Sequence, residues 1–363
     1  MAERKNLTED RKIDHIKLAV SQDVEFKRKT TLLECIEFIH MPLPELNLDE
    51  ILISTEFLTK KISAPIMIAG MTGGTREAYK LNKIMAKAAQ RLNIPMGVGS
   101  QRAMLENSSL IDSYKVVRTN APDIPIIANI GVSQIIRDIG KNQIEKIINV
   151  LNADALAIHL NPLQEAVQPE GEPFYAGFIE KLARIIDNLE IPLILKETGA
   201  GFSKESAEMI KDLDIYAIDI GGAGGTSFSK IEALRAKNEY IKHHVAKTFE
   251  EWGIPTAASI LEVKTILGNK VRVIATGGIR DGLMAAKALR LGADLVGYAL
   301  PVIRAAYYGG EEAVYNLLSR YIMEIKVALF LTGSRNINDL RSKPIVITGR
   351  LKDWIEQRKL LLS

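Results

Sequence analysis

Short apolar runs alternate with longer amphipathic segments along most of the chain. The short runs are rich in Ile, Val and Ala, have the length of single strands, and end in glycine or polar residues. Between them, segments such as 77–93 and 178–190 place apolar residues three and four positions apart, which predicts helices with one buried face. The expected strands cover residues 64–70, 95–100, 125–131, 155–161, 192–198, 215–222, 271–278 and 295–301.

This alternation favours one fold class. A strand followed by a helix implies parallel pairing, because a parallel return needs a long crossover that is usually a helix. Eight such units predict an α/β protein built as a (β/α)8 barrel, or TIM barrel, with an N-terminal extension. A doubly wound open sheet has the same periodicity, so the pattern alone does not exclude it.

The segments outside the repeats suggest a division of the chain. Residues 1–63 would form the N-terminal extension, with a helix and a hairpin near residues 51–65, and flank or cover the barrel. Residues 64–333 would form the catalytic barrel, and residues 334–363 a C-terminal tail. An extra helix is expected over residues 230–253, in a long connection that follows a strand.

Composition indicates where in the cell the protein is located and which classes of partner it binds. The chain has 363 residues, 47% of them hydrophobic, and a net charge of +3, which gives no reason to expect binding to nucleic acid or to a membrane. It has one cysteine, Cys35, no apolar signal peptide and no run of about 18 apolar residues. We therefore expect a cytoplasmic protein. The apolar segment 324–333 fits either the core or an interface between subunits.

Candidate chemistry lies at the C-terminal ends of the expected strands, where barrels place their active sites. At GGIRDG (277–282) two glycines precede a helix start, so that backbone N–H groups can approach an anion while Arg280 binds it in bidentate fashion. GGAGGTS (221–227) suggests a close approach of the backbone to a flat or anionic ligand. The alternatives are an ordinary tight turn for the first motif and a lid hinge for the second.

The strand at residues 155–161 ends in HLNPLQE (159–165). Alternation along a strand places Ala155, Ala157, His159 and Asn161 on one face, which we expect to be the barrel interior. Pro162 ends the strand, and an amide and a carboxylate follow at positions 164 and 165. One carboxylate beside amides, without a His or Cys cluster, does not make a zinc site but suits Mg2+ with phosphate oxygens as its other ligands.

Basic residues indicate an anionic ligand. Lys196 is expected on the inner face at the end of the fifth strand, where a buried ammonium needs an anionic partner. That partner is either a structural salt bridge or a cofactor or substrate. Arg102 follows the second strand, and Arg11 and Lys12 lie near the N-terminus, where a solvated helix face explains them equally well.

Taken in order, these motifs resemble one family. RKIDHI (11–16), MTGG (71–74), GVGSQR (97–102), HLNPLQE, LKETGAG (195–201), GGAGGTSF and ATGGIRDG are similar to motifs of the type 2 isopentenyl-diphosphate isomerases. HLNPLQE together with GVGSQR is the specific part, whereas other barrels share GGIRDG. Family members often carry Trp at the position of Phe228, which leaves the wall of the substrate pocket less defined.

The resemblance implies an FMN-dependent enzyme of isoprenoid precursor biosynthesis. It would interconvert isopentenyl and dimethylallyl diphosphate with Mg2+ and with FMN reduced, usually by NADPH, as a homo-oligomer (tetramer or octamer). Residues implied at the flavin are Met71, Thr72, Gly73, Ser100, Asn129, Lys196, Thr226, Gly278, Ile279, Arg280, Ala299 and Leu300. Residues implied at the substrate are Arg11, Lys12, Ser100, Arg102, His159, Asn161 and Gln164. His159 and Gln164 would also be catalytic beside the flavin ring, and Glu165 would be the Mg2+ ligand.

The residues themselves make this chemistry plausible. Isomerisation moves a proton along an allyl unit, and the sequence contains no obvious strong acid and no paired carboxylates. In the mechanism that the resemblance implies, the reduced flavin transfers the proton and Lys196 stabilises negative charge on its ring. The alternatives are a flavin oxidoreductase, such as a 2-hydroxy acid oxidase or an IMP dehydrogenase, and a non-catalytic phosphate-binding barrel. A 2-hydroxy acid oxidase needs a histidine base, and an IMP dehydrogenase needs a cysteine nucleophile. The expected loops contain neither.

Overall fold

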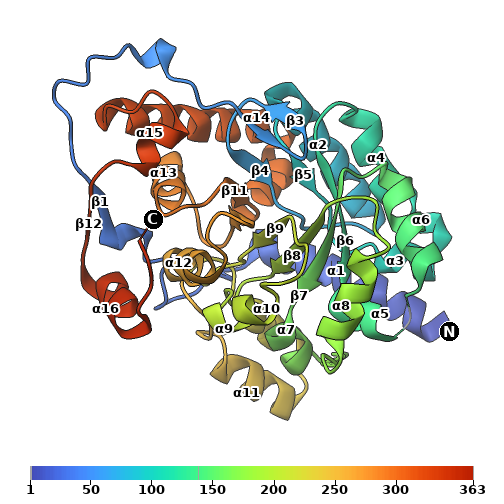
Figure 1. The fold of residues 1–363 in the computed structure, drawn as a ribbon. Coiled ribbons are helices and arrows are strands. Elements are labelled where there is room, and N and C mark those ends of the chain that lie inside the picture. The colour runs from blue at the N-terminus through green and yellow to red at the C-terminus, as the bar shows by residue number, and fades with distance from the viewer. Residues whose placement is uncertain (1, 138, 363) are drawn as a thin grey trace.

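The computed structural model describes residues 2–137 and 139–362. Eight parallel strands form a closed barrel in the order in which they occur along the chain, and the last strand pairs with the first (Figure 1). The (β/α)8 barrel is therefore confirmed, and the open sheet is excluded. The strands are β4 (Ile66–Ile68), β5 (Met96–Gly97), β6 (Ile126–Gly131), β7 (Ala155–Leu160), β8 (Leu193–Glu197), β9 (Ala217–Asp219), β10 (Arg272–Ala275) and β11 (Leu295–Tyr298).

Alternation along the strands divides the core into two parts. Ala155, Ala157 and Ile194 pack inside the barrel, whereas Ile158 belongs to the larger core between strands and helices. The inward face predicted for residues 155–161 is thus confirmed. Several strands are shorter than expected because the glycines at their ends leave the sheet; Gly221, at φ +49°, turns the chain soon after β9.

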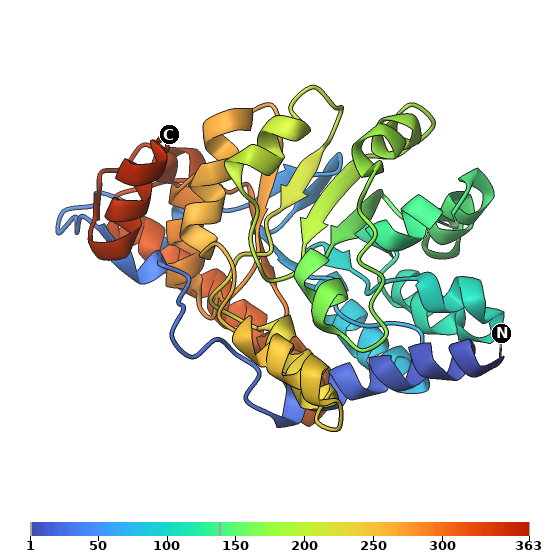
Figure 2. The same cartoon turned by 90° about the horizontal axis from the view of Figure 1, so that it is seen from below.

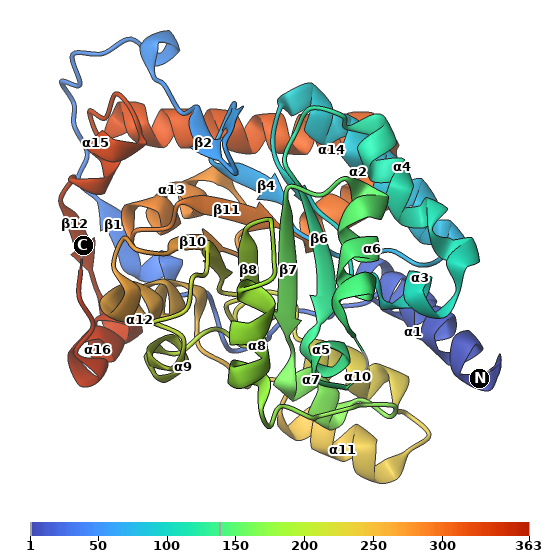
Figure 3. The same ribbon diagram turned by 45° about the vertical axis from the view of Figure 1, so that its right-hand side comes forward.

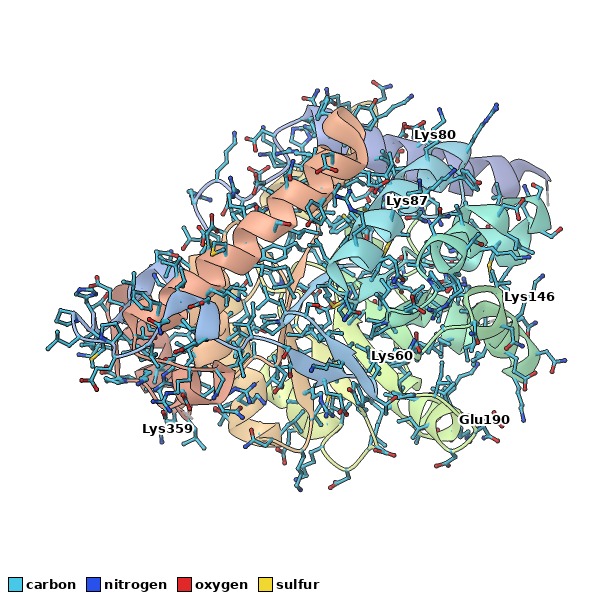
Figure 4. The ribbon with its side chains drawn as sticks, turned by 90° about the horizontal axis from the view of Figure 1, so that it is seen from above. Lys60, Lys80, Lys87, Lys146, Glu190 and Lys359 are labelled. Carbon is cyan, nitrogen blue, oxygen red and sulfur yellow. The ribbon has the colours of Figure 1, made fainter. Side chains whose placement is uncertain are left out.

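Helices cover the outside of the barrel. In α2, Thr75 accepts a hydrogen bond from the N–H of Ala78 at the N-terminus, and Asn93 ends the helix in the left-handed conformation. Lys80 and Lys87 on α2 lie on its outer side (Figure 4). The helices around the barrel are α2 (Arg76–Leu92), α3 (Arg102–Glu106), α4 (Asp112–Asn120), α5 (Val132–Arg137), α6 (Lys141–Leu151), α7 (Pro162–Val167), α8 (Phe178–Ile186), α9 (Lys204–Met209), α12 (Thr256–Leu267), α13 (Gly282–Arg290) and α14 (Leu300–Leu331). No helix in the described ranges is long and apolar enough to span a membrane.

The N-terminal extension contacts both ends of the barrel. The hairpin β2 (Thr55–Phe57) and β3 (Lys60–Ile62) closes the N-terminal end, where Phe57 and Leu58 pack against the inner strand residues. Lys60 on this hairpin forms a 2.7 Å ion pair with Asp154 (Figure 4). The helix α1 (Ala2–Ser21) crosses the opposite end beside α10 (Phe228–Arg235) (Figure 2). The expected helix and hairpin are both present.

The C-terminal tail returns to the N-terminal extension. Strand β1 (Ile36–Phe38) pairs antiparallel with β12 (Ile345–Ile347), which the sequence pattern did not predict. The remaining elements are η1 (Leu33–Cys35), η2 (Leu48–Glu50), η3 (Ser108–Leu110), α15 (Ile337–Arg341) and α16 (Gly349–Arg358). The division at residues 63 and 333 stays an interpretation, because extension, barrel and tail contact one another.

The extra helix expected over residues 230–253 is wrong as a single element. The segment forms two helices, α10 (Phe228–Arg235) and α11 (Tyr240–Thr248). The chain turns back between them, which buries Ala246 against Ala233 and lets Ser229 donate a hydrogen bond to the carbonyl of Ala246 at 2.6 Å. A straight helix would leave this small apolar face in solvent.

Candidate active site

One large cavity opens at the C-terminal end of the barrel and has a volume of about 260 Å3. Figure 3 shows the arrowheads of β6 and β7 pointing to this end, where α5, α7, α10 and α11 lie. The structure brings every residue named above for flavin, substrate or metal to its wall. These residues are Arg11, Lys12, Met71, Thr72, Gly73, Ser100, Arg102, Asn129, His159, Asn161, Gln164, Glu165, Lys196, Thr226, Gly278, Ile279, Arg280, Ala299 and Leu300.

Lys12 is fixed at the cavity wall by contacts from the barrel. Its Nζ donates hydrogen bonds to the carbonyls of Gly73 at 2.8 Å and Ser100 at 2.7 Å, and to the hydroxyl of Tyr114 at 2.9 Å. Burial raises the pKa of Tyr114 well above its usual value, so this hydroxyl keeps its proton and donates a hydrogen bond to the carbonyl of Ser100. The alternative that Lys12 lies on a solvated helix face is therefore wrong. Arg11, one residue earlier on α1, also lines the cavity.

His159 is a neutral imidazole with a defined tautomer. Its Nδ1 lies 2.8 Å from Oδ1 of Asn129, whose amide is oriented by donating to the carbonyl of Val98 at 3.0 Å. Nδ1 therefore carries the hydrogen, and Nε2 is an acceptor. Burial, followed by the positive charges of Lys196 and Arg11, lowers the pKa of His159 to about 3.

Gln164 contacts a buried carboxylate that the sequence reasoning missed. Its Nε2 donates to Oε1 of Glu232 at 2.9 Å, and Nε2 of His15 lies 2.8 Å from the same oxygen. Arg235 donates to Oε2 of Glu232 at 2.6 Å. Burial acts to raise the pKa of Glu232, but His15, Arg235 and Gln164 outweigh it and lower this pKa to about 2. The available signal was helical spacing, because Glu232 lies four residues after Phe228, which lines the cavity.

Glu165 is held by three donors at the edge of the cavity. Its Oε1 accepts from Nδ2 of Asn161 at 3.0 Å, and its Oε2 accepts from Nε2 of Gln168 and the N–H of Glu172, both at 2.7 Å. Within the described ranges, no group of three or more His, Cys, Asp or Glu side chains could hold a metal. A single carboxylate on the wall fits a Mg2+ ion that takes its other ligands from a phosphate-bearing substrate and water.

Arg102 connects the same region to the loop after α7. Its Nε lies 2.7 Å from Glu106 and its Nη1 lies 3.1 Å from Glu172. Because the N–H of Glu172 donates to Glu165, the guanidinium of Arg102 and the carboxylate of Glu165 are held by one loop.

The two glycine-rich loops make a cradle that fits a phosphate group. A Cβ on Gly225 would lie 2.4 Å from the N atom of Gly278, so the loops pack closely only because both residues are glycine. The helix α14 begins at Leu300 beside this cradle, and the dipole of the helix gives its N-terminus a partial positive charge at the cavity end. Arg280 lies on the same wall, where its Nε donates to Glu25 at 3.0 Å.

Lys196 forms the structural salt bridge that the sequence left open, and its role beside a cofactor or substrate stays a prediction. It lines the cavity, and its Nζ lies 2.8 Å from Oδ2 of the buried Asp219. Asp219 was not proposed from the sequence, although the strand pattern IYAID places it on the inward face of the neighbouring strand. Phe228 also lines the cavity, and its ring lies 6.2 Å from that of His15 in an edge-to-face arrangement.

Comparisons with known proteins show which proteins this chain is similar to. The model of the FMN-dependent dehydrogenase family matches residues 176–347. The isopentenyl-diphosphate delta-isomerase of Pyrococcus furiosus is 47% identical over 96% of this chain and 89% of its own. The enzyme of that name from Thermococcus kodakarensis is 47% identical over 98% and 96%.

Solved structures share the fold at low identity. The flavin-binding domain of baker's yeast flavocytochrome b2 matches with a TM-score of 0.70 and 16% identity, over 92% of this chain and 82% of that one. A lactate oxidase from Pediococcus acidilactici matches with a TM-score of 0.68 and 16% identity, over 96% and 94%. These likenesses support the barrel alone. The identity to the curated relatives, over nearly the whole length, shows that the chain belongs to the isopentenyl-diphosphate delta-isomerase family.

Proposed function

We propose that this protein interconverts isopentenyl diphosphate and dimethylallyl diphosphate in a cavity that also holds FMN. The observation that carries the proposal is the assembly of the cavity wall. It combines a glycine cradle, several basic side chains, one buried carboxylate, the amide of Gln164 and the neutral imidazole of His159. Family membership supports the reaction, because the relatives bear its name.

The cradle suits the phosphate of FMN. Gly278, Ile279 and Arg280, together with the start of α14 at Ala299 and Leu300, would hold that phosphate. Met71, Thr72, Gly73, Ser100, Asn129, Lys196 and Thr226 would line the ring. When bound and reduced, FMN supplies the proton donor and acceptor that the allylic shift needs. NADPH is the proposed reductant.

The opposite part of the wall suits a diphosphate. Arg11, Lys12 and Arg102 would bind its oxygens, and Glu165 would hold Mg2+ against it. Neutralising the diphosphate supplies the binding energy that orients the alkene for reaction.

Gln164 and His159 would position the reacting end of the substrate. The amide of Gln164 is oriented by its bond to Glu232 and by accepting from Nδ2 of Asn161 at 3.2 Å. His159 stays neutral in this environment and offers Nε2 as an acceptor. Both groups would offer the substrate a polar contact that their own hydrogen bonds hold in one orientation.

An anaerobic assay tests the proposal. Purified protein is supplied with FMN, Mg2+ and isopentenyl diphosphate, first with the flavin oxidised and then with the flavin reduced by dithionite. We expect dimethylallyl diphosphate only in the reduced sample, with the flavin still reduced at the end. Product in neither sample, with FMN nevertheless bound, would contradict the isomerase and turn the search to oxidoreductase substrates.

Three further expectations belong to this proposal. A homo-oligomer, tetramer or octamer, is expected, and light scattering on the purified protein measures its mass. Cytoplasmic location stays a prediction that cell fractionation tests. Replacing NADPH by NADH in the reduction assay measures which reductant the protein uses.

A further inference from the structure

A buried ion pair lies directly beneath the floor of the cavity. Lys196 and Asp219 face each other across the neighbouring strands β8 and β9, with Nζ and Oδ2 2.8 Å apart. Their side chains are 12% and 4% exposed. Lys196 lines both the large cavity and a small void of about 10 Å3, whereas Asp219 lines the small void alone. The cation therefore lies between the cavity and the anion.

The carboxylate of Asp219 is held in one orientation. Its Oδ1 accepts a hydrogen bond from the hydroxyl of Thr276, and that hydroxyl oxygen accepts from the N–H of Gly221 at 3.1 Å. Because Thr276 accepts from the backbone, its own hydrogen is directed at Asp219. The rest of the void is lined mainly by apolar side chains, such as Met67, Ile127 and Ile274.

An ion pair in this position is a poor means of stabilising the fold. Removing both charges from water costs about as much as their attraction returns, and apolar residues of similar volume often serve equally well. The pair also lies where positive charge is already high, because Arg11 and Lys12 line the same cavity. Its location therefore points to an electrostatic role.

We propose that Asp219 is a positioning residue that aims the ammonium of Lys196 at the cavity and offsets its charge. This inference rests on the proposed function, in which Lys196 would line the ring of FMN. An unpaired buried ammonium at that place would strongly favour any form of the ring that carries negative charge. In an isomerase that returns its flavin unchanged, stabilisation beyond what the paired Lys196 supplies would make the reduced ring a weaker proton donor. The Lys196–Asp219 pair orients a donor at the ring while leaving the floor close to neutral.

The test is to remove the negative charge and measure the flavin itself. In Asp219→Asn the amide keeps the shape of the side chain, and Lys196 becomes an uncompensated cation. Sulfite adds through its sulfur lone pair to N5 of an oxidised flavin and gives an anionic ring. The affinity for sulfite therefore reports the electrostatic potential around the flavin ring. We expect sulfite, followed by the absorbance of the FMN-loaded protein, to bind at least about tenfold more tightly. The midpoint potential should rise in the same direction, by about 30 mV for each tenfold change.

Two control variants separate the effect of the lost charge from the effect of a loosened structure. Asp294→Asn removes a carboxylate that pairs with Lys264 and Arg341 at the other end of the barrel, and should leave both flavin readouts as in the wild type. The double variant Lys196→Met/Asp219→Asn has neither charge of the pair, so its sulfite affinity should return close to the wild-type value. This double variant also decides the matter if Asp219→Asn alone fails to fold. A loss of about tenfold or more in its affinity would mean that Lys196 acts as an unpaired cation in the wild type, and would overturn the inference.

Failure of the proposed function and failure of the role of Asp219 give different results. Wild-type protein that binds no FMN would overturn the proposed function and this inference with it. Wild-type protein that binds FMN, with sulfite affinity and potential unchanged in Asp219→Asn, would overturn the inference alone.

Discussion

Replacing Glu232 by glutamine removes the charge that joins α1, α10 and Gln164. The carboxylate is fully buried and contacts His15, Arg235 and Gln164, and its pKa lies at about 2 against an ordinary value of 4.5. That difference corresponds to about 3 kcal/mol in favour of the charged form in the folded protein. Glutamine has nearly the same shape but cannot pair with Arg235, so we expect Glu232→Gln to lose about 3 kcal/mol of stability at pH 7.

The sign of the pH dependence follows from the lowered pKa. The stabilisation by Glu232 is full above about pH 4.5 and is lost as the pH falls from 4.5 towards 2. The stability difference between wild type and Glu232→Gln should therefore shrink as the pH is lowered through this range. Urea unfolding at fixed protein concentration, followed by tryptophan fluorescence at several pH values, measures that difference.

The activity of the same variant tests the link to Gln164. Glutamine offers one acceptor oxygen where Glu232 offers two, so His15, Arg235 and Gln164 would compete for it. The amide of Gln164 is then held less firmly, and kcat should fall by about tenfold or more while KM changes little. Glu262→Gln is the matched control, because Glu262 is also fully buried and paired, with Arg358 at 2.8 Å and Trp354 at 2.9 Å, but lies away from the cavity. It should lose stability and keep kcat. Equal stability of Glu232→Gln and wild type at pH 7, or a difference that does not change with pH, would refute the reasoning.

Other changes give further tests. Glu165→Gln should abolish the response to Mg2+ while FMN still binds, since Glu165 is the one carboxylate among the described residues that line the cavity; an unchanged Mg2+ response in the turnover assay would make the assignment wrong. Arg11→Ala should raise KM and leave FMN affinity unchanged, and an unaltered KM would return Arg11 to the solvated helix face. Phe57→Ala should lower the free energy of unfolding by about 3 to 5 kcal/mol, because it opens a cavity in the hairpin that closes the barrel; denaturant unfolding with little loss would show that the hairpin does not support the core. Burial, opposed by three backbone N–H donors, raises the pKa of Glu197 to about 7, so its contribution to stability is full below pH 4.5 and is lost as the pH rises through about 7; Glu197→Gln should flatten that part of the stability profile.

Much of the site could be predicted because strand ends carry positional information. The carboxyl ends of parallel strands meet at one end of a barrel, so residues such as His159 and Lys196, which follow apolar runs on the inward face, had to converge. Residues that act from helices carry no such signal. Glu232 resembles any charged residue of a helix until the fold places it against His15, 217 positions earlier in the chain.

The sequence by itself determined the strands and helices of the barrel, because periods of 2 and 3.6 in the apolar residues decide which face of each element is buried. Only the tertiary structure decided the partners of the polar groups. The pairing of β1 with β12, the turn between α10 and α11, and the contact of Asp219 with Lys196 and Thr276 join segments whose local patterns are short or ambiguous. A three-residue strand or a lone buried carboxylate is stable only in contact with its partner. Its position is therefore a property of the packed molecule, and the local sequence does not encode it.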